Sequence, residues 1–133
     1  MRNLTIFLFS LLLLTVLVQP AEARPKTRFD ATTNTCRVLD HGPLEWASSA
    51  WGEGGREFKK VCQGCHFKGN DKGVPFLWAE SKSSAAWNRV FDQKYPKCAR
   101  DGSWDVLTRE QQMEVNDYLY RFAKGSDDPG NGC

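Results

Sequence analysis

The hydrophobic positions of the chain form one long run near the N-terminus and several later stretches with helical spacing. The long run extends from Ile6 to Val18, follows a positively charged Arg2, and precedes Ala21-Glu22-Ala23, an A-x-A cleavage site. It holds about 13 residues, fewer than the ~20 that a membrane-spanning helix needs. Residues 1–23 therefore predict a cleaved export signal, with an uncleaved N-terminal anchor as the alternative. No other segment is apolar enough to span a membrane.

The first helical pattern leads into the most distinctive motif of the chain. Five positions recur at steps of four, three, four and three, which places them on one face of a helix: Trp51, Gly55, Phe58, Cys62 and Cys65. Gly42-Pro43 marks a helix start upstream, because proline fits the first helical position. The glycines at 52, 54 and 55 weaken the helix interior and let another backbone approach closely.

Two further helices are predicted nearer the C-terminus. Ser84 can cap a short helix that carries Trp87, Val90 and Phe91 on one side. Thr108-Arg109-Glu110-Gln111 is a capping box for a last helix that ends at Lys124-Gly125. Its buried stripe is predicted at Val115, Leu119 and Phe122. Residues 67–82 and 92–105 are predicted loops, and no alternating stretch indicates a strand. We therefore expect a small all-α fold, with an arm at 24–45, a helical domain at 46–125 and a polar tail at 126–133.

Composition narrows the function classes. The chain has 133 residues, with 18 Lys and Arg against 16 Asp and Glu, a net charge of +2. One small domain with balanced charge does not predict a nucleic-acid interface. The export signal places the five cysteines in the periplasm or at the cell exterior, where disulfides persist.

The chemistry is concentrated in Cys62-Gln63-Gly64-Cys65-His66. C-x-x-C-H in an exported protein is typical of covalent attachment of haem c. Two thiols one helical turn apart can add to the two vinyl groups of the porphyrin, and the adjacent histidine can bind the iron. Three alternatives are a redox dithiol, half of a zinc site with Cys98 and Cys133, and structural cysteines in other bridges.

The wider pattern resembles the class I monohaem cytochrome c family over about residues 47–124. The matching residues are Gly55-x-x-Phe58, the C-x-x-C-H motif, and the last helix with Tyr118-Leu119. The resemblance implies a cytochrome c-like all-α fold of three or more helices around one covalent haem. It also implies thioethers to Cys62 and Cys65, with His66 as the proximal iron ligand.

The sixth iron ligand departs from the family pattern. Class I cytochromes usually place a methionine in the loop before the last helix, and residues 92–105 contain none. The candidates are Cys98 in that loop, His41 upstream of the first helix, and Met113 inside the last helix. An open sixth site is the remaining alternative.

The cysteines outside the haem motif are odd in number. Cys36, Cys98 and Cys133 allow one bridge within the chain, and the third cysteine then stays unpaired or pairs between chains. A Cys36–Cys133 bridge would leave Cys98 for iron, and bridges from Cys98 to either of the others are equally consistent with the sequence.

The sequence thus favours an exported single-electron carrier over an enzyme in its own right. Its expected partners are other redox proteins, within or outside a larger electron-transfer complex. The alternatives are a haem subunit of a redox enzyme, for example one that oxidises sulfur compounds with a His/Cys haem, a haem that binds a small ligand at an open site, and an assembly role within a larger complex.

Overall fold

The computed structural model describes residues 24–126 and Cys133. The predicted export signal at 1–23 and residues 127–132 of the predicted tail lie outside the described residues. The described chain forms a hairpin of β1 (Thr27–Asp30) and β2 (Thr35–Val38), followed by four α-helices. These are α2 (Pro43–Ala47), α3 (Glu53–Glu57), α4 (Ser84–Gln93) and α5 (Arg109–Arg121). A π-helical turn, Phe58–Cys62, continues α3, and short 3₁₀ turns lie at Ala79–Ser81 and Lys97–Ala99.

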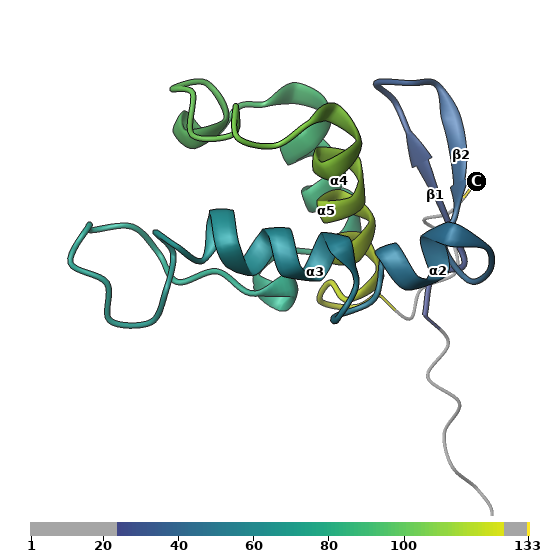
Figure 1. The fold of residues 1–133 in the computed structure, drawn as a ribbon, viewed down its shortest axis with the longest axis horizontal. Coiled ribbons are helices and arrows are strands. Elements are labelled where there is room, and N and C mark those ends of the chain that lie inside the picture. The colour runs from purple at the N-terminus through teal and green to yellow at the C-terminus, as the bar shows by residue number, and fades with distance from the viewer. Residues whose placement is uncertain (1–23, 127–132) are drawn as a thin grey trace, which may run out of the picture.

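The crossing of α3 and α5 organises the fold (Figure 1). Gly54 lies against the backbone of α5, where a Cβ atom would overlap the carbonyl of Glu114. The sequence predicted this close approach from the glycines of the helix. Phe58, one turn later, is 1% exposed and packs its ring 5.8 Å from that of Tyr118 on α5.

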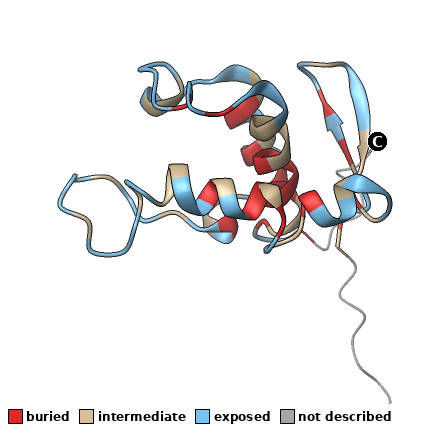
Figure 2. Cartoon of the chain, in the orientation of Figure 1, coloured by how far each residue is buried: buried red, intermediate tan, exposed pale blue. Residues whose placement is uncertain are grey.

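The hydrophobic core lies where α4 and α5 meet the α3 segment, and the buried residues concentrate there (Figure 2). Val115 and Leu119 are buried, as the predicted stripe requires, whereas Phe122 is partly buried at its edge. From α4, Trp87 enters this core and donates its indole N–H to the carbonyl of Ala79 at 2.7 Å. The described residues contain no helix of the length and hydrophobicity needed to cross a membrane.

The helix boundaries agree with the sequence in part. Pro43 begins α2 at its first position, and the reciprocal Thr108–Gln111 capping box begins α5, both as predicted. Ser83, rather than Ser84, caps α4, because its side chain accepts a hydrogen bond from the Ala86 N–H. Ser84 is buried instead and donates to the carbonyl of Tyr120 at 3.0 Å. Helix α5 ends at Arg121, three residues before the predicted Lys124.

The prediction of an all-α fold is wrong, because the predicted arm forms a two-stranded antiparallel sheet. Its register pairs Phe29 with Cys36 and Asp30 with Thr35, across a turn that contains Asn34 at φ +54°. The alternation was hidden because the buried face is charged. Arg28 and Asp30 are 0% and 2% exposed, whereas Phe29 between them is 44% exposed.

A cluster of ion pairs holds this hairpin on α5. Arg28 donates from Nε to Asp117 at 2.7 Å and from Nη2 to Asp30 at 2.9 Å. Arg37 of β2 donates from Nε to the second oxygen of Asp117 at 2.8 Å. Charges are stable in the interior when they are paired and hydrogen-bonded, so this cluster explains how a strand with a charged inner face packs on a helix.

Candidate functional site

The C-x-x-C-H motif lines a largely apolar cavity of about 250 Å³. Cys62, at the end of the π-helical turn, lies in its wall together with Cys65 and His66. Most of the remaining wall is hydrophobic, and includes Phe58, Leu77, Trp87, Val90, Trp104 and Leu119. The cavity therefore sets two thiols and an imidazole against aliphatic and aromatic surface.

Backbone hydrogen bonds fix the motif in place. The N–H groups of Cys65 and His66 both donate to the carbonyl of Cys62, at 3.2 and 2.9 Å, which closes a turn at the helix end. The segment at Leu77 runs alongside this turn: its N–H donates to the carbonyl of His66 at 3.1 Å, and its carbonyl accepts from Gln63 Nε2 at 2.8 Å. These bonds hold the thiols and the imidazole on the same wall of the cavity.

The tautomer of His66 follows from its partner. Nδ1 lies 2.6 Å from the backbone carbonyl oxygen of Pro75. A carbonyl can only accept, so Nδ1 carries the proton of the neutral ring and Nε2 keeps its lone pair. A backbone carbonyl that orients a histidine in this way is the usual support of a metal-binding imidazole.

Three cysteines of this cavity are free thiols: Cys62, Cys65 and Cys98. Burial raises the pKa of Cys62 to about 12, and the neighbouring Cys98 and Cys65 add to that shift. Cys62 is therefore a protonated thiol at neutral pH. Cys98 lines the same cavity as Cys62, although the two residues are 36 positions apart in sequence.

The three candidates for a sixth ligand occupy different places. Cys98 lies in the 3₁₀ turn Lys97–Ala99 and lines the same cavity as His66. His41 has a side chain that is 77% exposed and paired with Asp40 at 2.8 Å. Met113 lines another cavity, with its sulfur 3.7 Å from Nη1 of Arg37. The fold therefore brings Cys98 to the motif and does not bring His41 or Met113 there.

The remaining cysteines form a disulfide between Cys36 and Cys133, whose Cα atoms are 5.9 Å apart. This is one of the pairings that the sequence left open. It occupies Cys133, which the zinc alternative required. Among residues 24–126 and 133, no three His, Cys, Asp or Glu side chains converge as a site for a bare metal ion. The motif also follows a helix rather than the strand that precedes a thioredoxin-like dithiol.

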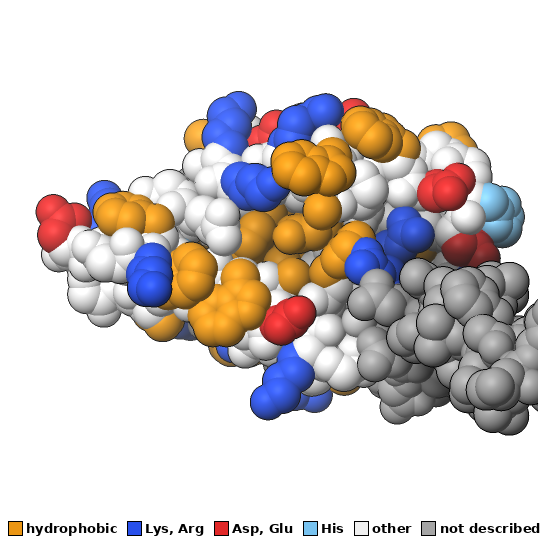
Figure 3. Space-filling model, turned by 90° about the horizontal axis from the view of Figure 1, so that it is seen from below, with side chains coloured by type: hydrophobic (Ala, Val, Ile, Leu, Met, Phe, Trp, Pro, Cys, Tyr) orange, Lys and Arg blue, Asp and Glu red, His pale blue; other side chains and the backbone are white. Residues whose placement is uncertain are grey.

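Sequence reasoning missed the contribution of the 75–77 segment. The Pro75 carbonyl accepts a hydrogen bond from His66, and the N–H and carbonyl of Leu77 bond to His66 and Gln63. The side chain of Leu77 also lines the cavity. The backbone contacts do not depend on residue type, so no sequence motif indicates them. Large side chains such as Trp46, Trp51 and Trp78 are exposed, and one face shows hydrophobic groups bordered by Lys and Arg (Figure 3).

No family model, no curated protein and no solved structure matches this chain.

Proposed function

We propose that this chain is an exported c-type cytochrome, which transfers single electrons through one covalently bound haem. The observation that carries the proposal is the sharing of one apolar cavity by two free thiols and an imidazole with an available Nε2. The proposal agrees with the resemblance of the C-x-x-C-H segment to the cytochrome c family.

The residues of the cavity fit a haem. Cys62 and Cys65 would hold the porphyrin through thioethers, and Nε2 of His66 would bind the iron. A haem would bring most of the iron's ligands itself, so a cluster of three or more protein ligands would not be required. When bound, the haem supplies a one-electron change between ferric and ferrous iron, with a potential set by axial ligands and burial.

In this function the protein itself would orient the His66 imidazole and exclude water from the cavity. The Pro75 carbonyl fixes the plane and tautomer of His66. Trp87, Val90 and Leu119, all buried, supply apolar wall that a flat ring system can cover. A charge change inside such a wall is less screened than in water, so the wall itself shifts the potential.

Cys98 would supply the second protein ligand of the iron in this proposal, because it is the one of the three candidates that lines the cavity. A thiolate donates electron density to iron and favours the ferric state. This position also supports the second candidate function, a His/Cys haem subunit within a redox enzyme complex.

Covalent attachment is tested first. The full chain is expressed with its export signal in a host that matures c-type cytochromes, and the purified protein is extracted with acidified acetone. We expect the haem colour to stay with the protein, and the double variant Cys62→Ser, Cys65→Ser to lose it. Cys98→Ala is the matched control, because it removes a thiol of the same cavity that makes no thioether in this proposal. Complete loss of colour from the parent protein would contradict the proposal.

The sixth ligand is tested by electron paramagnetic resonance of the ferric protein. We expect a low-spin thiolate signal that disappears in Cys98→Ala. His41→Ala and Met113→Leu are the matched controls and should leave the signal unchanged. A six-coordinate spectrum that survives Cys98→Ala would contradict the assignment of Cys98, while haem retention in the first experiment would still support the cytochrome proposal.

A further inference from the structure

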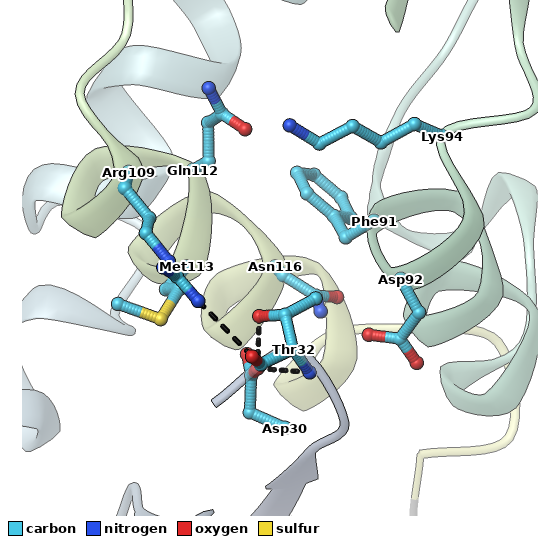
Figure 4. Close-up of a pocket in the computed structure, with 9 residues that line it drawn as sticks. All are labelled: Asp30, Thr32, Phe91, Asp92, Lys94, Arg109, Gln112, Met113 and Asn116. Carbon is cyan, nitrogen blue, oxygen red and sulfur yellow. Dashed lines mark hydrogen bonds between the residues drawn. The ribbon is translucent and has the colours of Figure 1, made fainter. Parts of the chain in front are cut away.

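Two cavities of the fold differ in the charge of their walls. The cavity between the hairpin, α4 and α5 is lined by both acids and bases, among them Asp30, Asp92, Lys94 and Arg109 (Figure 4). The cavity of the C-x-x-C-H motif is largely apolar. Among the described residues that line it, Lys82 is the one lysine or arginine, and there is no aspartate or glutamate. A single cation in an apolar wall favours an occupant that brings an anionic group to it.

Backbone contacts fix the position of Lys82 in this wall. The residue lies between the 3₁₀ turn Ala79–Ser81 and α4, and its carbonyl accepts a hydrogen bond from the Lys124 N–H at 3.0 Å. The next residue, Ser83, forms a parallel bridge with Lys124 and caps α4. The side chain of Lys82 therefore starts from a fixed point of the wall, in a different part of the fold from the C-x-x-C-H motif.

The ammonium group of Lys82 has no acidic partner among the described residues. Its Nζ lies 5.7 Å from the centroid of the Trp87 ring, and it makes no hydrogen bond or ion pair with the part of the chain that the structure describes. Trp87 lines the same cavity and is 3% exposed. A separation of 5.7 Å is close to the limit of about 6 Å for a cation–π contact, so the ring holds the ammonium only weakly.

A haem carries the kind of group that this lysine could pair with. The two propionate carboxylates of a haem lie on the edge of the ring opposite the two vinyl groups. Thioethers to Cys62 and Cys65 would hold the vinyl edge at the motif, so the propionate edge would point away from the motif. Lys82 lines the same cavity outside the motif, where its ammonium could donate to a carboxylate.

We propose that Lys82 is a positioning residue for the haem: its ammonium donates to a propionate carboxylate and fixes how the ring lies in the cavity. This inference rests on the proposed function, since it needs a haem held at Cys62 and Cys65. The pair would also act on the iron, because an unpaired carboxylate near the iron opposes the uptake of an electron. In an apolar wall such charges are weakly screened, so Lys82 should raise the reduction potential.

The reduction potential of the full haem-loaded chain tests this role. We expect Lys82→Met to shift the equilibrium between ferric and ferrous haem by about tenfold toward the ferric state, a potential lower by about 59 mV for a one-electron couple. Lys82→Arg keeps the charge and should keep the parent potential, which a merely structural role does not predict. Lys26→Met is the matched control, because it removes the same charge from an exposed residue before β1 that lines neither cavity.

Infrared difference spectra between the ferric and ferrous states test the contact itself. We expect the propionate carboxylate band to shift in Lys82→Met and to return in Lys82→Arg. An unchanged potential in Lys82→Met, or a lower potential without a band shift, would each overturn the proposal and show that Lys82 covers Trp87 without touching a propionate. Lys82→Gln gives the same two readings if Lys82→Met takes up no haem.

Haem retention separates the failure of this inference from the failure of the proposed function. The parent and all variants are first extracted with acidified acetone. If the parent loses its haem colour, the cytochrome proposal fails and the role of Lys82 fails with it. If the parent and the Lys82 variants keep the haem and share one potential, the role of Lys82 alone fails.

Discussion

At the scale of single residues, the most unusual feature is a buried arginine on a β-strand. Arg28 is fully buried, and its guanidinium contacts Asp117, Asp30 and Asn88. Asp117 is also fully buried and is shared between Arg28 and Arg37. Removing one partner of such a group leaves an uncompensated charge in the interior, so the members of the cluster depend on one another.

Asp30 makes this cluster sensitive to acid. Burial opposes ionisation of Asp30, but hydrogen bonds from Thr32, Arg28 and Thr33 and the charge of Arg28 outweigh it, and the pKa falls from 3.8 to about 2. The ionised carboxylate of Asp30 is thus more stable, relative to its protonated form, in the folded chain than in the unfolded chain. Its contribution, about 2 kcal/mol, is complete above about pH 4 and is lost as the pH falls toward 2.

Urea unfolding at pH 5 and at pH 2.5 checks this expectation. The free energy of unfolding of the parent should fall between these two values by more than that of Asp30→Asn, which cannot gain a proton at this position. An equal fall in both proteins would show that Asp30 does not carry the acid sensitivity.

At the scale of elements, the α3–α5 crossing depends on one glycine. Gly54→Ala would place a methyl group into the backbone carbonyl of Glu114 and force the helices apart. We expect a loss of about 3 kcal/mol in the free energy of unfolding, which is typical of severe overpacking. Chemical denaturation of the variant measures this loss.

Gly73→Ala is the matched control for that substitution. Gly73 has open space around its Cβ position and φ +66°, so alanine there costs backbone strain of about 1 kcal/mol without a clash. Equal losses in the two variants would mean that the close contact with α5 does not decide the stability of the crossing.

Local signals decided which elements could be predicted. Thr108 and Gln111 indicate the start of α5, because a capping box involves only four consecutive residues. The hairpin has no such signal. Its inner residues, Arg28 and Asp30, are charged, and their burial depends on Asp117 almost ninety residues later. A pattern of apolar and polar positions cannot show a strand whose buried face is ionic.

The same contrast holds for the candidate site. Cys62, Cys65 and His66 were identified because their spacing is local and chemically specific. The Pro75 carbonyl that orients His66 belongs to the backbone, so no residue type signals it. The placement of Cys98 against the same cavity, with His41 and Met113 elsewhere, required the packing of the loop before α5.

At the scale of the whole molecule, the Cys36–Cys133 disulfide joins residues 97 positions apart. A crosslink of this span restricts the unfolded chain strongly, so its removal should lower the free energy of unfolding by about 2–4 kcal/mol. The double variant Cys36→Ala, Cys133→Ala measured by chemical denaturation tests this value. Comparing the parent with and without a reductant is the control, since the reduced parent should match the double variant.

The disulfide also changes what a protease can do to this chain. It closes most of the described polypeptide into a covalent ring at the end that carries the hairpin, while the loop after His66 extends from the opposite end (Figure 1). A single nick anywhere between residues 36 and 133 opens the ring without releasing a fragment. The two new ends stay tethered and can be held in register by the packed helices, so a nicked molecule keeps both halves of its cavity wall in one piece.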